Sequence, residues 1–140
     1  MIFVEQRLLN IEECLKILCQ GIRNRAYQNE AEVRSEFMRT VRNFLDHPDF
    51  KGVNVREEEA VIEGRPDARI GRLAIEFESP FDESGRVRES VTEEKVQKVR
   101  EKYLREYRQV GRAVRAVITN GIEVVFLDEE GNLVERGVVC

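Results

Sequence analysis

The chain has 140 residues, of which 41% are hydrophobic and 36% charged, and its formal net charge is −4. This length predicts one domain with a sizeable core, and the composition excludes a disordered chain and a helix that spans a membrane. A protein that is basic throughout is also excluded, so a nucleic-acid-binding surface must be local. We expect a cytoplasmic protein, because residues 1–7 lack the blocks of a signal peptide.

Two helices are predicted in the first third of the chain. Apolar residues recur at helical spacing in residues 3–20, and Gly21 is expected to end this helix. The second helix is predicted over residues 29–47, with Asn29 as its N-cap.

Strands surround one long helix in the rest of the chain. Residues 53–62 and 68–78 are the predicted limbs of a hairpin that contributes three strands. The later elements are a helix at 89–109 and strands at 113–118, 123–127 and 133–139. This order predicts a single α/β domain, a mixed β-sheet flanked by helices. Its expected parts are a helical N-terminal extension at 1–28, a core at 29–128 and a C-terminal hairpin strand at 129–140.

Two glutamates interrupt an otherwise apolar strand. Glu76 and Glu78 lie on one side of residues 73–78, so at least one is expected to face a helix, where its burial must be offset by a partner or a metal. Asp67 follows the Pro66 turn and is expected beside the end of this strand.

A fourth carboxylate comes from the second helix. At 100° per residue, Glu30 shares the stripe of Val33 and Phe37, so we expect it to point inward. Converging carboxylates without histidine or cysteine are typical ligands of Mg²⁺ or Mn²⁺. The pattern favours phosphodiester hydrolysis.

These residues resemble the PD-(D/E)xK restriction-endonuclease-like nuclease superfamily. Pro66-Asp67 matches the "PD" pair, Glu76-Phe77-Glu78 stands where (D/E)xK is expected, and Glu30 matches the first-helix glutamate. Within the superfamily, the chain is similar to the N-terminal nuclease region of type I restriction enzyme subunits. The resemblance covers about residues 29–127 and implies a restriction-endonuclease-like fold, a Mg²⁺ (or Mn²⁺) cofactor and DNA cleavage of the restriction or repair type.

The chain departs from the superfamily at Glu78, which replaces the lysine that orients or deprotonates the attacking water. The resemblance leaves three alternatives open: the glutamate serves in its place, Lys95 or Lys102 of the following helix replaces it, or the chain is an inactive relative that binds nucleic acid or protein. In the active alternatives, Asp67 and Glu76 hold the metal. Glu78 then binds a second metal or positions water, and Glu30 holds the metal-bound solvent network.

Each of these features also has an ordinary explanation. Turn chemistry accounts for Asp67, a solvent-facing edge strand accounts for Glu76 and Glu78, and the helix dipole accounts for Glu30.

A basic segment adjoins the proposed site. Residues 86–115 carry ten basic side chains and five glutamates. A stripe on the long helix is expected to contact a phosphate backbone independently of sequence, and consists of Lys95, Lys98, Lys102 and Arg105. Ion pairing is the alternative, because Glu94–Lys98 and Glu101–Arg105 have i, i+4 spacing.

DNA is the expected partner. A homodimer formed through the first helix would supply one site for each DNA strand. A separate subunit could instead supply specificity or a motor, since the chain lacks a GxxxxGK[ST] phosphate loop.

The three cysteines are expected to be core or bystander thiols. Cys14 and Cys19 fall on different helix faces and Cys140 is the last residue, so the spacing predicts neither a disulfide nor a zinc site. The excess of arginine over lysine and the density of charge are typical of a thermophilic source.

Overall fold

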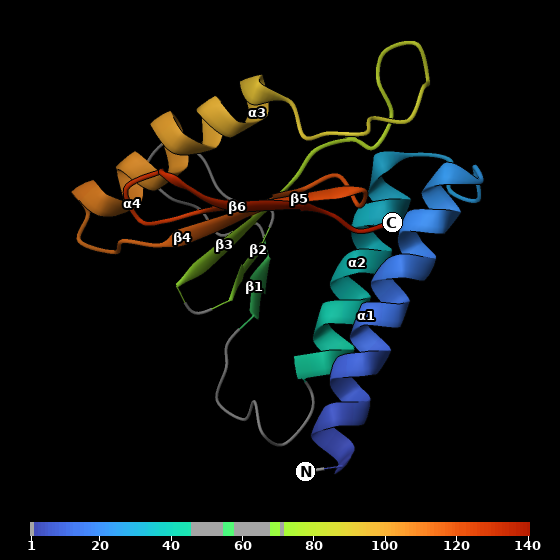
Figure 1. Cartoon of the computed structure of the whole chain (residues 1–140). Helices are drawn as coiled ribbons and strands as arrows, with labels where there is room; N and C mark the ends of the chain where they lie inside the picture. The colour runs from blue at the N-terminus through green and yellow to red at the C-terminus, as the bar shows by residue number, and fades with distance from the viewer. Residues whose placement is uncertain (1, 46–54, 58–67, 71) are drawn as a thin grey trace.

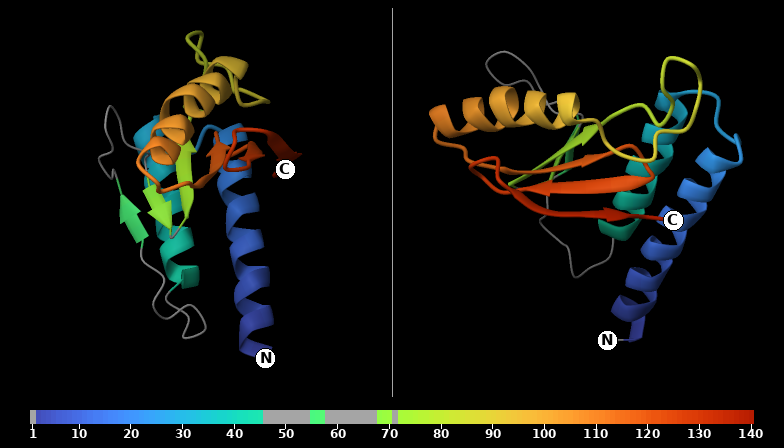
Figure 2. Two further views of the ribbon diagram at one scale, coloured as in Figure 1. Left: turned by 90° about the vertical axis from the view of Figure 1, so that its left-hand side faces the viewer. Right: turned by 45° about the horizontal axis from the view of Figure 1, so that its top comes forward.

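The computed structural model describes most of the chain, namely residues 2–45, 55–57, 68–70 and 72–140. Two helices open it, α1 (Ile2–Arg23) and α2 (Glu30–Leu45). They lie side by side, and one end of each extends beyond the sheet, on the side of the molecule where the N-terminus lies (Figures 1 and 2). Neither they nor any other helix within the described residues has the length and apolar character needed to cross a membrane.

Within the described residues, six strands form one sheet, in the order β1-β2-β3-β4-β5-β6. Their bounds are β1 Val55–Glu57, β2 Ala68–Ile70, β3 Leu73–Phe77, β4 Arg115–Thr119, β5 Glu123–Leu127 and β6 Leu133–Val138. Among these strands of the described residues, β3 and β4 are the one parallel pair, and a helical crossover joins them, as parallel neighbours require. The predicted mixed α/β architecture is confirmed.

Residues 68–78, predicted as one limb of a hairpin, contain a chain reversal. Ile70 pairs with Leu73, so β2 and β3 are antiparallel neighbours. The predicted pairing with the preceding limb is present between β1 and β2, where Val55 pairs with Ile70. The expected turn at Gly64 and Pro66 lies outside the described residues.

The ends of the first two helices depend on different kinds of contact. Asn29 Oδ1 accepts a hydrogen bond from Glu32 N–H at 3.0 Å, which confirms Asn29 as the N-cap of α2. Gly21, by contrast, lies inside α1 rather than ending it. A Cβ there would approach Tyr27 Cε2 to 2.6 Å, so the glycine allows the Tyr27 ring to pack against the helix.

The crossover helix starts later than predicted and is not uniform. It consists of α3 (Glu93–Lys98), a π-helical segment η2 (Val99–Leu104) and α4 (Arg105–Gln109). Thr92 is the N-cap of α3, and its hydroxyl accepts a hydrogen bond from Lys95 N–H at 3.2 Å. The helix therefore begins where a side chain satisfies its first N–H groups.

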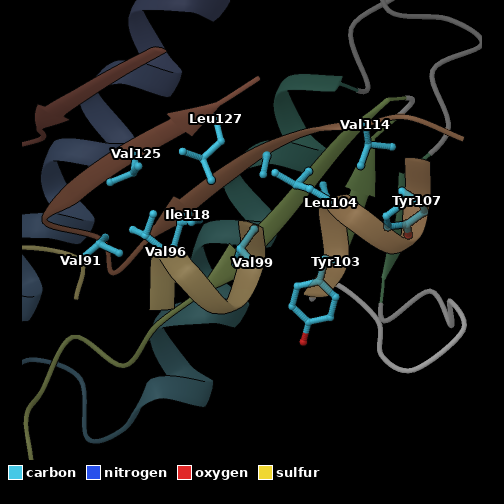
Figure 3. Packing of buried hydrophobic residues seen from close by; sticks show 12 residues of the cluster. Val91, Val96, Val99, Tyr103, Leu104, Tyr107, Val114, Ile118, Val125 and Leu127 are labelled. Carbon is cyan, nitrogen blue, oxygen red and sulfur yellow. The ribbon is translucent and has the colours of Figure 1, made fainter. Parts of the chain in front are cut away.

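Two apolar clusters lie on opposite faces of the sheet. The crossover helix covers one face, where its buried residues meet those of the strands (Figure 3). This cluster includes Ala74, Val96, Val99, Leu104, Ile118, Val125 and Leu127. The second half of α1 and the helix α2 cover the other face, through a cluster that includes Leu18, Ile22, Val33, Phe37, Ile75 and Phe77. The first helix is thus part of the core as well as an N-terminal extension.

One prediction about the cysteines is wrong. Cys19 and Cys140 form a disulfide with a Cα–Cα distance of 6.1 Å. They are 121 positions apart, and they meet because β6 returns the chain end to the buried side of α1. Cys14 is exposed and unpaired, as its place on another helix face predicts.

Candidate functional site

Both glutamates of the predicted motif lie at the end of β3, on the face covered by α3. Glu76 is 3% exposed and pairs across the parallel ladder with Ile118. Glu78 follows the strand, and its backbone N–H donates to Thr119 O at 3.0 Å, which continues the pairing with β4. The prediction that at least one of these carboxylates faces a helix is therefore confirmed.

A lysine of α3 approaches the buried carboxylate. Lys95 Nζ lies 3.9 Å from Glu76 Oε2, and its side chain is 19% exposed. This separation is that of an ion pair rather than a hydrogen bond. The cation offsets part of the cost of burying Glu76. Lys102, the other lysine considered from sequence, is half-buried in η2, seven positions farther along the chain.

Glu78 has a different environment from Glu76. Oε1 of Glu78 accepts a hydrogen bond from Thr92 N–H at 2.9 Å, and Oε2 accepts one from the Thr92 hydroxyl. Arg88 Nη1 lies 3.7 Å from Oε2. Glu78 thus joins the end of β3 to the residue that caps α3.

A third carboxylate at this junction was not predicted. Glu123 is 8% exposed, and its Oε1 accepts hydrogen bonds from Val91 N–H at 2.9 Å and from Arg136 Nη2 at 2.8 Å. The same parity argument that identified Glu76 would have found it, because Glu123 alternates along β5 with the buried Val125 and Leu127.

Three carboxylates near the start of α3 each have a basic side chain beside them. Within the described residues, Glu76, Glu78 and Glu123 are each within 4.0 Å of a basic side chain, respectively Lys95, Arg88 and Arg136. The hydrogen bond to Glu123, and to a smaller extent the one to Glu93, raises the pKa of the Arg136 guanidinium above its ordinary value. Arg136 therefore remains charged. These pairs allow three carboxylates to occupy one junction.

Glu30, the fourth carboxylate expected from the sequence, belongs to a helix on the other face of the sheet. Glu30 is at the first position of α2 and is half-buried. That helix packs on the opposite face of the sheet, where the Phe37 and Phe77 ring centroids are 4.8 Å apart. The described residues contain no group of three or more histidine, cysteine, aspartate or glutamate side chains placed to hold a metal. Asp67, with the rest of the Pro66-Asp67 pair, lies outside the described residues.

The basic stripe continues along the crossover helix from Lys95. Lys98 and Arg105 are exposed and Lys102 is half-buried. Neither Glu94–Lys98 nor Glu101–Arg105 is among the salt bridges of the described part of the chain, so the alternative of i, i+4 pairing is not realised there.

Comparison with known proteins gives one fold relationship. No family model matches the chain, and no curated protein sequence matches it. A chain in a cryo-electron microscopy structure of a DrdV–DNA complex is similar, with a TM-score of 0.61 and 15% sequence identity. The match covers 94% of this chain and 87% of that one. At this identity the similarity shows a shared fold.

The geometry of these side chains defines the candidate site. It lies at the end of β3, beside the parallel neighbour β4 and under the first turn of α3. Ligand sites in open α/β sheets are commonly at the carboxyl ends of such strands. The junction combines a buried carboxylate, an ammonium group and a fixed helix start, which suits the binding of a phosphate-containing substrate beside a cation.

Proposed function

We propose that this protein is a metal-dependent nuclease of the PD-(D/E)xK, restriction-endonuclease-like type, which cleaves DNA phosphodiester bonds in restriction or repair. The observation that carries the proposal is the approach of Lys95 Nζ to within 3.9 Å of the buried Glu76 Oε2. A lysine of α3 thereby stands beside the acid of the motif, although position 78 is a glutamate. The fold similarity to a chain of a DNA complex supports DNA as the substrate.

Asp67 and Glu76 are the proposed ligands of Mg²⁺ or Mn²⁺. Glu76 fits this role because it is a hard oxygen donor held in a buried position. The antiparallel pairing of Ala68 with Ile75 supports Asp67 as the second ligand. In the sequence, Asp67 directly precedes Ala68 and Glu76 directly follows Ile75. A bound divalent ion would neutralise phosphoryl oxygens and make water a better nucleophile.

The remaining roles belong to side chains near this junction. Lys95 orients the attacking water and places positive charge beside the scissile phosphate. The role expected for Glu30, to hold the metal-bound solvent network, stays a prediction, because α2 packs on the face of the sheet opposite Glu76. The side chains of Lys98, Lys102 and Arg105 contact the DNA backbone, in a way that depends on salt but not on sequence.

Cleavage of both strands of a duplex requires two sites. We propose that a second copy of the chain supplies the other site, with α1 as the contact, or that a partner subunit delivers the DNA. A cytoplasmic location in a thermophilic source would be compatible with the Cys19–Cys140 disulfide, because intracellular disulfides are common in hyperthermophiles.

The first experiment measures the nicking of supercoiled plasmid with and without Mg²⁺ or Mn²⁺. We expect Glu76→Gln to reduce the rate by at least about 100-fold, since even residues that only support a metal ligand contribute 10- to 100-fold. Lys95→Met should also abolish most activity. Arg108→Met is the matched control, because Arg108 lies on the same crossover helix and is exposed but is not part of the basic stripe, and it should keep most of the rate.

Two results would contradict the proposal. Nicking that survives in Glu76→Gln would indicate a contaminating nuclease. A folded wild-type protein that binds DNA but does not cut it with either metal would instead support the alternative function, an inactive nuclease-fold module. Thermal unfolding of every variant should be measured in parallel, so that loss of activity is not confused with loss of fold.

A binding experiment tests the basic stripe separately. Each phosphate contact removed should lower the slope of log affinity against log salt by about 1. Lys98→Ala and Lys102→Ala together should therefore reduce this slope by about 2. An unchanged slope would exclude these side chains from the DNA interface.

A further inference from the structure

The first turn of α3 is tied to the end of β3 through Thr92. Its backbone N–H donates to Glu78 Oε1 at 2.9 Å, and its hydroxyl donates to Glu78 Oε2. The same hydroxyl oxygen accepts a hydrogen bond from Lys95 N–H at 3.2 Å. A single side chain therefore links Glu78 to Lys95.

The chemistry of these groups fixes the direction of each hydrogen bond. An ionised carboxylate only accepts, so the one proton of the Thr92 hydroxyl points to Glu78. The lone pairs of that oxygen then face the helix, where Lys95 N–H is among the first donors and has no partner within the helix. Glu78 thus sets the hydroxyl orientation that allows Thr92 to cap α3.

The cap and the ion pair lie side by side at one junction. Glu76 and Glu78 are two positions apart in the sequence, at the end of β3, and Thr92 and Lys95 are three positions apart at the helix start. Glu78 contacts Thr92, while Glu76 Oε2 lies 3.9 Å from Lys95 Nζ. A shift of Thr92 would therefore move Lys95 relative to Glu76.

We propose that Glu78 is a positioning residue: by holding Thr92, it fixes the first turn of α3 and keeps the Lys95 ammonium beside Glu76. The inference rests on the proposed function for its catalytic meaning. An anchored helix start matters for Lys95 because its four-carbon stem is flexible. This role differs from the expectation that Glu78 binds a second metal or positions water, and it uses the hydrogen bonds that both Glu78 oxygens accept from Thr92.

A second carboxylate at the same junction provides a matched control. Glu123 Oε1 accepts a hydrogen bond from Val91 N–H at 2.9 Å, one residue before Thr92. It contacts Arg136 and does not belong to the Thr92 link. Glu123→Gln therefore weakens the contact that holds Val91, in the segment before α3. It leaves the contacts between Glu78, Thr92 and Lys95 in place.

The test measures the reactivity of the Lys95 amine in metal-free protein. Brief acylation followed by peptide mapping gives the labelling rate of Lys95, with the exposed Lys98 as internal reference. In Glu78→Gln and Thr92→Val, Lys95 should label several-fold faster relative to Lys98. Thr92→Ser keeps the hydroxyl and should restore the wild-type ratio.

Cleavage kinetics provide the second readout. Glu78→Gln and Thr92→Val should lower kcat for plasmid nicking by about 10- to 100-fold, with KM for DNA unchanged, because residues that orient a catalytic group have effects of this size. Thr92→Ser should retain most of the wild-type kcat. Circular dichroism below the unfolding temperature confirms that each variant is folded.

The outcomes separate this inference from the proposed function. Faster labelling of Lys95 in both variants, but not in Thr92→Ser or Glu123→Gln, would support the positioning role even if the wild-type protein cut no DNA. An unchanged Lys95 labelling ratio would overturn it, whatever happens to cleavage. An equal increase in Glu123→Gln would also overturn it, because it would indicate general loosening of the helix start.

Discussion

The two faces of β3 are equally buried but chemically different. Ile75 and Phe77 are 3% and 2% exposed and pack against α1 and α2. On the other face, Ala74 and Glu76 are 1% and 3% exposed, under the crossover helix. An apolar side chain is stabilised by such burial, whereas a carboxylate needs a compensating cation. On β3, one face is therefore entirely apolar, whereas the other buries a charge within an apolar cluster.

The largest effect on stability is expected on the apolar face. Phe77→Ala should lower the free energy of unfolding by about 3–5 kcal/mol, because it leaves a cavity against Phe37. Urea unfolding monitored by circular dichroism measures this. Phe126→Ala is the control, since Phe126 is 39% exposed and its substitution should cost no more than about 1 kcal/mol. Equal losses in the two variants would contradict the contrast.

The disulfide is the next largest contribution on the same face. Cys140→Ser should lower the free energy of unfolding by about 2–4 kcal/mol, because the bond closes a loop over most of the chain. Cys14→Ser should have little effect, since Cys14 is exposed and unpaired. Reductant should remove the difference between wild type and Cys140→Ser; a wild-type protein insensitive to reductant would argue against the bond.

Removing the charged pair under the crossover helix should not lower the stability. Replacing a buried ion pair by apolar side chains is often neutral or stabilising, so the double variant Glu76→Met, Lys95→Met should be as stable as wild type or up to about 4 kcal/mol more stable. The same variant should cut no plasmid. Lys95→Met alone should be the less stable protein, because it leaves Glu76 buried without this cation. A strongly destabilised double variant would show that the pair supports the fold.

The smallest effect on stability is expected from an ion pair between the end of α1 and the segment before α3. Arg23 Nη1 donates to Glu89 Oε1 at 2.8 Å, and this hydrogen bond lowers the pKa of Glu89 below its ordinary value of 4.5. Because the folded-state pKa is the lower one, the stabilisation is complete above pH 4.5 and is lost as the pH falls through the folded-state pKa. The melting temperatures of wild type and Glu89→Gln should therefore differ slightly at pH 7 and converge in acid. A difference that persists in acid would exclude this ion pair as its cause.

The sequence located several parts of the candidate site correctly. Alternation along residues 73–78 placed Glu76 and Glu78 on one face, and their side chains do meet α3. Lys95 was one of two lysines considered from the following helix, and it is the one that approaches Glu76. The ligand role of Asp67 stays a prediction, because this residue lies outside the described part of the chain. Glu30, which periodicity turned inward, is half-buried on the other side of the sheet.

Local chemistry determined the order of helices and strands, the mixed α/β class and the cap at Asn29, because periodicity and capping act between residues a few positions apart. Contacts between distant segments were decided by the tertiary structure alone. The Cys19–Cys140 disulfide joins residues 121 positions apart, and the close packing of Tyr27 places Gly21 inside α1. The start of α3 at Thr92 depends on Glu78, which belongs to another element. Spacing along a chain does not encode which distant side chains will satisfy a donor or fill a gap, so these features require the assembled fold.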